Sequence, residues 1–196
     1  MSRYLIVGLG NPGRDYADNR HNVGYRCVEH LAAAHGMAFS RRQKRNTVAL
    51  GTIKDRSVIL AKPRTYMNKS GGPAAALARF YRVPLDRLLI VYDDLDLPPG
   101  TTRLRPAGGS GGHRGMRSVI EQLGSREFPR LRIGIGRPPG RMDPADYVLQ
   151  DLSDEEEILL ERTLEQAQGA IELWLEEGVE EAMSRYNRSV DGAGAE

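Results

Sequence analysis

The feature that most constrains this chain is a short apolar segment that ends in a glycine-rich turn, at residues 4–13. Residues 4–7 are aromatic, β-branched or aliphatic, which predicts a strand that stops where the glycines begin. Three glycines suit a turn that larger side chains would crowd, and Pro12 fixes the backbone at its bend. Asn11 and His21 then fall at the carboxyl edge of a sheet. Ligands of open α/β sheets bind at that edge, so the turn indicates both a fold class and the place of a site.

The same glycines match the G-x-G-x-x-G pattern of dinucleotide-binding folds. That pattern requires a helix that begins at the last glycine and places its first N–H groups on a pyrophosphate. Here polar residues 14–19 follow Gly13, and apolar residues at helical spacing begin only near Asn22. The acid expected about 20 residues further on finds only Glu29, inside that helix. The favoured interpretation is a tight strand-ending turn that presents polar side chains.

Length and composition limit the class of protein. A chain of 196 residues is long enough to bury the core of one domain. No apolar run approaches the roughly 18–20 residues of a membrane span, and no charged-then-apolar leader is seen, so we expect no membrane association. The single cysteine, Cys27, excludes internal disulfides and favours a reducing, cytoplasmic setting. The histidines show no metal-ligand spacing, so we expect no metal.

The net charge of +2 is unevenly distributed along the chain. Residues 151–196 hold 14 acidic and three basic side chains, a net charge of −11, which leaves +13 on residues 1–150. A basic body with an acidic carboxyl-terminal flank indicates a polyanionic partner. The alternative is a basic protein with one solvated acidic helix. Arginine outnumbers lysine 24 to 4, which suits forked contacts to phosphate, although genome composition could produce the same bias.

Apolar patterning predicts an α/β fold: a single three-layer domain with a central mixed β-sheet flanked by helices, over residues 1–190. We expect a disordered tail at 191–196. The basic run 41–45 is expected to be either a phosphate contact or simply a solvated loop, and 137–151 a mobile loop or lid. Strands are expected at 4–7, 47–53, 58–62, 88–92, 101–105 (beside 88–92) and 131–135, and helices at 22–35, 73–81, 116–123, 154–177 and from there to about residue 188.

Two acidic residues follow the apolar run 88–92, which is typical of a central buried strand. Asp93-Asp-Leu-Asp96 could hold a divalent cation. A carboxylate at a strand end also commonly orients a histidine, and His21 is the natural partner because it too follows a strand-ending turn. Such a pair fixes the imidazole tautomer and stabilises the imidazolium, so that the histidine can act as a general base near neutral pH. A purely structural histidine is the alternative.

A second glycine-rich segment, 108–115, contains the G-x-S-x-G pattern of a nucleophile elbow around Ser110. That mechanism requires an acid and then a histidine after the serine. The one later histidine, His113, precedes every later aspartate, so the order fails. The glycines that surround His113 and Arg114 instead favour close approach of the backbone to a ligand.

Several segments together resemble the bacterial peptidyl-tRNA hydrolase family. They occur in the order found in that family and spread over roughly two thirds of the chain. The segments are 5–13, 20–22, 65–71, 93–100, 111–113 and 130–136.

The resemblance implies hydrolysis of the ester that joins a peptide to the 3′ end of tRNA, which frees the tRNA for reuse. It implies a monomer without metal or cofactor, in which His21 activates water, Asp93 supports it, and Asn11 distinguishes a peptide amide from a free amino group. The implied site for the peptide and the terminal adenosine comprises Tyr16, Tyr66, Met67 and Asn68, with His113 and Arg114 beside them. The implied clamp on acceptor-stem phosphates is Arg103, Arg105 and Arg132.

One residue departs from the family pattern. Arg114 stands where the family usually has asparagine, a residue thought to help hold water and substrate, so the way water is positioned is open here. A non-catalytic RNA-binding protein of the same fold is the alternative function. The presence of His21, Asp93, Asn11 and Asn68 favours the enzyme, because a binding protein needs no Asp–His pair.

Overall fold

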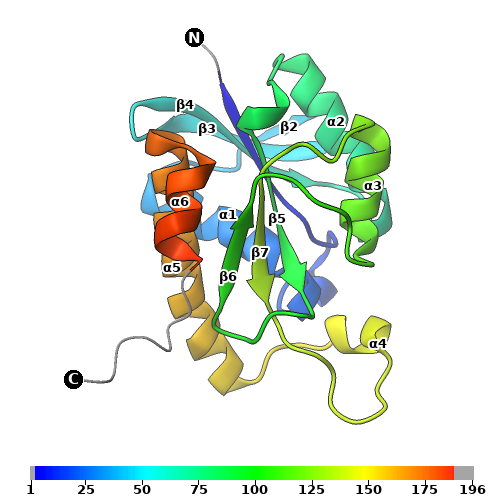
Figure 1. Ribbon diagram of the computed structural model, residues 1–196. Helices are drawn as coiled ribbons and strands as arrows, with labels where there is room; N and C mark the ends of the chain where they lie inside the picture. Colours follow the sequence, from blue (N-terminus) through cyan, green and yellow to red (C-terminus); the bar gives the residue numbers. More distant parts are fainter. Residues whose placement is uncertain (1–2, 188–196) are drawn as a thin grey trace, which may run out of the picture.

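The computed structural model describes residues 3–187 as a seven-stranded mixed sheet with helices on both faces (Figure 1). The strand order is β2-β3-β4-β1-β5-β7-β6. Four central strands, β4, β1, β5 and β7, run parallel, while antiparallel pairing adds β3 and β2 at one edge and β6 at the other. The strands are β1 (Tyr4–Gly8), β2 (Arg41–Gln43), β3 (Asn46–Ile53), β4 (Arg56–Pro63), β5 (Leu88–Asp94), β6 (Thr102–Arg105) and β7 (Arg130–Gly134).

The helices form the two outer layers. One face of the sheet is covered by α1 (Val23–Ala34), α5 (Asp154–Glu177) and α6 (Val179–Tyr186). The other is covered by α2 (Gly71–Phe80) and α3 (Arg114–Leu123). The short helix α4 (Pro144–Val148) lies beyond the carboxyl ends of β5 and β7 (Figure 1). The expected three-layer α/β domain is confirmed.

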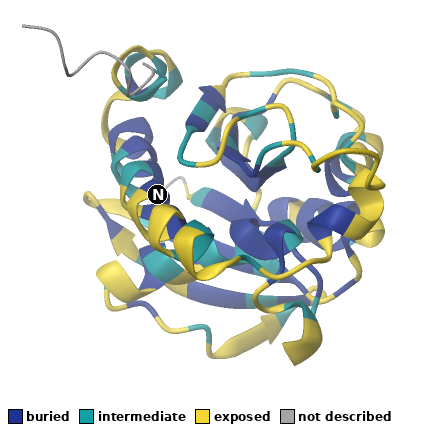
Figure 2. Ribbon diagram, turned by 90° about the horizontal axis from the view of Figure 1, so that it is seen from below, coloured by how far each residue is buried: buried dark blue, intermediate teal, exposed yellow. Residues whose placement is uncertain are grey.

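Burial on both faces explains the apolar strands. In β1, Ile6 packs into the core beneath α1 and α5, whereas Leu5 and Val7 pack into the core beneath α2 and α3. A strand covered on both sides carries apolar residues at consecutive positions instead of alternating with polar ones. Figure 2 shows the buried residues concentrated along the strands and the inward sides of the helices.

Two glycines bring the start of α1 against the sheet. A Cβ atom on Gly8 would lie 2.2 Å from the carbonyl oxygen of Gly24, and a Cβ atom on Gly24 would lie 2.5 Å from that of Val91. No side chain fits at either position. Because His21 lies only two residues before α1, this close approach places it beside the end of β5, where Asp93 lies.

Three local features differ from the sequence-based description. Residues 41–43 form the edge strand β2, because a tight turn at Lys44 and Arg45 folds them back onto β3. The strand β6 pairs with β7 and not with β5, because β7 is inserted between them after α3. Segment 137–151 contains α4, whose N-cap Asp143 accepts a hydrogen bond from the N–H of Ala145.

The tail expected at residues 191–196 lies outside the described residues, as does the expected helix end at residue 188. Among residues 3–187, no helix combines the length and apolar character needed to cross a bilayer.

Candidate active site

A cavity of about 580 Å³ opens at the carboxyl ends of the central strands. Its walls come from the loop after β1, the short helix after β4, the end of β5, the glycine-rich loop before α3, and α4. The residues expected at the site that line it are Asn11, His21, Tyr66, Met67, Asn68, Asp93, His113 and Arg114.

Asp93 is the centre of this cavity's polar network. Its carboxylate is 2% exposed and accepts hydrogen bonds from two histidines. Nδ1 of His21 lies 2.8 Å from Oδ2, and Nε2 of His113 lies 2.8 Å from Oδ1. The structure therefore contains the Asp–His pair that was expected from the sequence, with a second histidine added.

The hydrogen bonds determine the tautomers of both rings. Nδ1 of His113 accepts a hydrogen bond from the backbone N–H of Met116, so its proton is on Nε2 and is donated to Asp93. Because the Asp93 carboxylate can only accept, Nδ1 of His21 is the protonated nitrogen in the neutral ring. Nε2 of His21 then carries the lone pair, and it has no hydrogen-bond partner among residues 3–187. This is the protonation state that a general base requires.

The electrostatics reinforce this arrangement. Burial by itself would raise the pKa of Asp93, but His21 and His113 outweigh it and hold that pKa well below its ordinary value. Burial by itself would lower the pKa of His21, yet the Asp93 carboxylate and its hydrogen bond raise it above 6.5. Arg114 partly opposes this increase, since a nearby cation lowers the pKa of His21.

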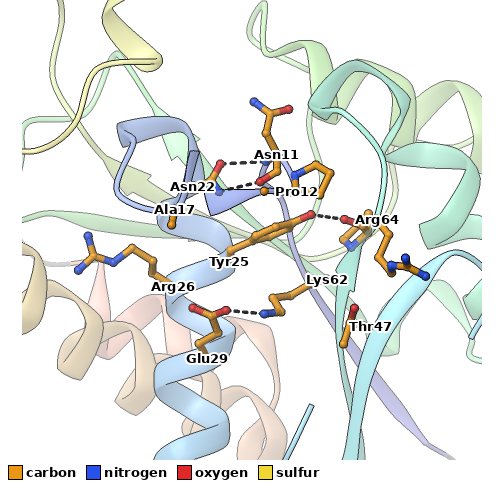
Figure 3. Close-up of a pocket in the computed structure, with 12 residues that line it drawn as sticks. Asn11, Pro12, Ala17, Asn22, Tyr25, Arg26, Glu29, Thr47, Lys62 and Arg64 are labelled. Carbon is orange, nitrogen blue, oxygen red and sulfur yellow. Dashed lines mark hydrogen bonds and ion pairs between the residues drawn. The ribbon is translucent and has the colours of Figure 1, made fainter. Parts of the chain in front are cut away.

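Asn11 is held in one orientation by two neighbours. Its backbone N–H donates to Oδ1 of Asn22 over 2.8 Å, and its carbonyl accepts from Nδ2 of Asn22 over 2.9 Å (Figure 3). Its side-chain Oδ1 accepts a hydrogen bond from the backbone N–H of Met67, 2.7 Å away. The turn after β1 is therefore attached both to the residue after His21 and to the loop after β4.

The segment that carries His21 is also fastened to the end of the 137–151 loop. Nη1 of Arg20 donates to the carbonyl of Asp151 over 3.0 Å, and Nη2 donates to Oε2 of Glu156 over 2.6 Å. The guanidinium lies over the ring of Tyr147, 4.4 Å from its centre. Asn19 bridges to Asp151 by backbone pairing and by a side-chain hydrogen bond of 2.6 Å.

The remaining expected residues lie outside this cavity. Tyr16 is not among the residues that line it, but its ring packs edge-on against that of Tyr66, 6.4 Å between centres. Arg103 and Arg132 are direct neighbours across β6 and β7, and Arg105 is further along β6. Nε of Arg132 donates to Oδ2 of Asp94 over 2.6 Å, so this arginine is already partly neutralised.

The carboxylates suggested as a cation site do not converge. Asp94 is paired with Arg132 and Asp96 with Arg137. Among residues 3–187, the ligand atoms that do converge, within 4.8 Å of one another, belong to His21, Asp93 and His113. Those atoms already hydrogen-bond to each other, so a cation would have to displace two protons.

Sequence reasoning missed two features of the site. It assigned His113 to substrate contact, whereas both ring nitrogens are engaged with Asp93 and Met116. It gave Asn22 no role, although this residue holds the turn that carries Asn11. Their positions next to His21 and inside a glycine-rich loop were the only available signals.

The glycine pattern after β1 does not open a helix. Gly13 has φ 113°, and it is followed by a single 3₁₀ turn at Arg14–Tyr16, while α1 starts ten residues after Gly13, at Val23. The N–H groups that would bind a pyrophosphate are therefore not placed at the turn. As an arrangement of groups, the cavity offers a base, a buried carboxylate and an amide donor, which suits attack of water on an ester or amide carbonyl.

Comparisons with known proteins show the family of this chain. A family model described as Peptidyl-tRNA hydrolase matches residues 5–193. A peptidyl-tRNA hydrolase of Chloroflexus aggregans is 52% identical over 185 residues, covering 94% of this chain and 98% of that protein. One of Syntrophomonas wolfei is 45% identical, covering 93% and 99%. The crystal structure of peptidyl-tRNA hydrolase from Acinetobacter baumannii superposes with a TM-score of 0.89 at 36% identity, covering 94% of each chain. By family model, sequence and fold alike, this chain belongs to the peptidyl-tRNA hydrolase family.

Proposed function

We propose that this protein hydrolyses the ester between the peptide and the tRNA of peptidyl-tRNA, with His21 as the general base. The observation that carries the proposal is the hydrogen-bonded set His21–Asp93–His113 at the wall of a cavity, in a chain of this family. A protein that only binds RNA has no use for a buried carboxylate that fixes a histidine tautomer.

The reaction needs no covalent intermediate on the enzyme. Nε2 of His21 takes a proton from water as the water oxygen attacks the ester carbonyl, and the imidazolium is stabilised by Asp93. The tetrahedral intermediate then expels the ribose oxygen, which takes the proton back from His21. The products are the free peptide acid and tRNA with a free 3′ hydroxyl group.

Asn11 and the residues after β4 supply the contacts to substrate. Because its Oδ1 accepts from the N–H of Met67, the side chain of Asn11 is oriented so that its Nδ2–H is available, and a peptide carbonyl would accept that donor. Asn68 lies on the same wall, and Tyr66 is 60% exposed at the mouth of the cavity. In this proposal Tyr66, with Tyr16 packed against it, contacts the peptide or the terminal base.

The acceptor stem is proposed to lie along β6 and β7. Arg103 and Arg105 are on the same side of β6, two residues apart, and Arg103 faces Arg132 across the strand pair. These three guanidinium groups can contact consecutive phosphates. We further propose that the enzyme acts as a cytoplasmic monomer. It is also proposed to use no metal, because protons occupy the nitrogens of His21 and His113 that converge on Asp93.

The test is hydrolysis of N-acetyl-aminoacyl-tRNA by His21→Ala. We expect turnover to fall about 10²–10⁴-fold, the usual contribution of a general base, with little change in tRNA affinity. His30→Ala is the matched control, since His30 is on α1 and its side chain hydrogen-bonds to Gln168 of α5, away from the cavity. An equal loss of binding and turnover, or full activity without His21, would overturn the assignment. Binding of tRNA by the wild-type protein without any hydrolysis would favour the RNA-binding alternative.

A further inference from the structure

The most basic part of this chain is not the proposed acceptor-stem face. Residues 30–85 contain eleven lysines and arginines and only one acid, Asp55, a net charge of +10 in a chain whose total is +2. This segment comprises β2, β3, β4 and α2, at the edge of the sheet opposite β6.

The acidic helix α5 neutralises only one side of this region. Nζ of Lys54 lies 3.7 Å from Glu172, and Nε of Arg56 donates to the carbonyl of Leu175. Lys62 is paired with Glu29 of α1. The other eight cations form no ion pair with any residue in the range 3–187.

Most of these unpaired cations surround the β2–β3 hairpin. All are exposed, and together with the half-exposed ring of Phe80 they form what we call the hairpin face. Nζ of Lys44 lies 5.0 Å from the centre of the Phe80 ring, and the backbone N–H of Arg64 donates to the carbonyl of Arg45 over 2.8 Å. These contacts join the hairpin to α2 and to the end of β4. The cations of the hairpin face are Arg41, Arg42, Lys44, Arg45, Arg64 and Arg79.

Hydrogen bonds hold the tip of the hairpin in an unfavourable backbone conformation. Lys44 and Arg45 have φ values of 47° and 59°, a left-handed region in which Asn-Gly is the preferred pair. The fully buried Asn46 maintains it, because its Nδ2 donates to the carbonyls of Lys44, over 2.9 Å, and Pro73, over 3.0 Å. Two long cations are thus kept at a position where they cost stability, which is typical of residues retained for binding.

A second cavity is lined by Asn11 of the active site and by Arg64 of the hairpin face. It has a volume of about 270 Å³, and Asn11 lines both this cavity and the catalytic one. Figure 3 shows its walls: Tyr25 and Pro12 on one side, Lys62 paired with Glu29, and Arg64 at the end of β4 with no partner among the residues drawn. A chain of phosphates that passes Asn11 would meet Arg64 and then the hairpin tip.

From this arrangement we propose that the hairpin face is a second binding surface for the phosphate backbone of the RNA substrate. It is separate from the β6–β7 arginines, because six strand spacings of about 4.8 Å separate the two edges of the sheet. The inference rests on the proposed function for the identity of the polyanion. An aromatic ring among unpaired arginines and lysines is the composition of a nucleic-acid surface.

The sharpest variant is Lys44→Asn/Arg45→Gly, which removes two charges and creates the preferred turn pair. The backbone hydrogen bonds of Asn46 and Arg64 to this turn remain available. We expect the melting temperature to rise while binding of deacylated tRNA weakens roughly tenfold near 0.1 M salt. The slope of log affinity against log salt should decrease by about 1.5 units, from two lost phosphate contacts. Weaker binding by a more stable protein cannot be attributed to misfolding.

Two controls separate charge from turn geometry. Lys54→Asn/Asp55→Gly makes the same change in the other left-handed turn, where φ is 49° and 58°, without altering net charge. Arg162→Gln/Arg185→Gln removes two positive charges from the acidic helices. Both should keep the wild-type salt slope. If the Lys44/Arg45 variant instead loses stability, Arg41→Gln/Arg42→Gln on the adjoining strand makes the same test.

The outcomes are distinguishable from failure of the proposed function. Wild-type protein that does not bind tRNA would overturn both. Binding of tRNA that the hairpin variants keep unchanged would overturn only this inference. If the hairpin variants lose binding to phosphatidylserine vesicles but keep tRNA binding, the hairpin face would be a membrane-binding surface, and the RNA inference would again be rejected.

Discussion

Oδ1 of Asn11 accepts a hydrogen bond from the backbone N–H of Met67, 2.7 Å away. An amide nitrogen cannot accept such a bond, so the orientation of the side chain is fixed and Nδ2 is its free donor. In Figure 3 the side chain points away from Asn22 and from the second cavity. The relationship gives the active site a neutral donor whose direction is set by a residue 56 positions away in sequence.

This geometry predicts a change of specificity in Asn11→Asp. The new carboxylate can still accept a hydrogen bond from the N–H of Met67, so the conformation of the loop should be kept. Its second oxygen, however, places a negatively charged acceptor where Asn11 has an N–H donor. We expect hydrolysis of N-acetyl-aminoacyl-tRNA to fall about 10²-fold, as when a positioned donor is lost, while the unblocked aminoacyl-tRNA loses less because its ammonium group is attracted. The measurement is the ratio of the two rates. An unchanged ratio would remove Asn11 from substrate discrimination.

Asp93→Asn should move the acidic limb of the pH–rate profile to lower pH. The carboxylate is what raises the pKa of His21 against the effect of burial, so its removal leaves burial unopposed. Turnover should also fall, because an amide at this position no longer fixes the tautomer of His21. The loss should be smaller than in His21→Ala, since the imidazole is still present. An unmoved limb in kcat/KM would contradict the pairing.

The same substitution should destabilise the protein most between about pH 4 and pH 6.5. Because the pKa of Asp93 is lower in the folded state, Asp93 stabilises the fold at any pH above its unfolded-state pKa. That stabilisation is lost in acid, as the pH falls through the folded-state pKa. Because the pKa of His21 is higher in the folded state, protonated His21 stabilises the fold at any pH below its unfolded-state pKa. That stabilisation is lost as the pH rises through the folded-state pKa. Melting temperatures of both proteins across this range provide the check.

Arg114→Asn should shift the acidic limb the other way, to higher pH. Removing the cation leaves the effect of Asp93 on His21 less opposed, so the base is protonated up to a higher pH. Activity above that limb should be kept. Arg114→Ala should mainly raise KM, since Arg114 is exposed at the cavity wall and can donate to substrate. Loss of turnover at saturating substrate in the alanine variant, with unchanged affinity, would place Arg114 in the chemical step.

Local patterns predicted most of the fold and the central pair of the site. The apolar run before Asp93 and the glycine turn before His21 each end at the sheet edge, so their meeting followed from topology alone. The order of β6 and β7 did not follow, because it depends on how the chain returns after α3. The bonds from Asn11 to Met67 and from Arg20 to Glu156 join segments 56 and 136 residues apart, and no local pattern encodes such pairings.

The proposed acceptor-stem clamp predicts unequal contributions from its arginines. Arg103→Gln/Arg105→Gln should weaken tRNA binding and reduce the salt slope by about 1.5 units, from two lost phosphate contacts. Arg132→Gln should reduce it less, because Asp94 already accepts a hydrogen bond from Arg132. Turnover at saturating substrate should largely survive. A salt slope that is unchanged in the double variant would exclude this edge of the sheet from RNA binding.

The ion pair of Arg20 and Glu156 predicts a link between the 137–151 loop and the catalytic base. Arg20 precedes His21, is 8% exposed, and holds the carbonyl of Asp151 as well as Glu156. Glu156→Gln keeps the capping box, since glutamine can also accept from the N–H of Ser153, but it removes the charge that Arg20 faces. We expect a loss of about 1–2 kcal/mol in the free energy of unfolding, because one partner is a buried guanidinium.

Glu157→Gln is the matched control for this last prediction. Glu157 pairs with Arg26 through hydrogen bonds of 2.8 and 2.6 Å that also join α1 to α5, but among the described residues Arg26 forms no hydrogen bond or ion pair with the 137–151 loop. The side chain of Arg26 is more exposed than that of Arg20, 22% against 9%. Glu157→Gln should therefore lower the free energy of unfolding by less than about 1 kcal/mol. The two variants should differ more clearly in kcat/KM than in melting temperature. In Glu156→Gln, Arg20 keeps its hydrogen bond to the carbonyl of Asp151 but loses the ion pair that holds its guanidinium in place, so kcat/KM should fall several-fold, whereas it should stay near wild type in Glu157→Gln. Equal kcat/KM in the two variants, measured well below their melting temperatures, would show that the Arg20–Glu156 pair only stabilises the fold.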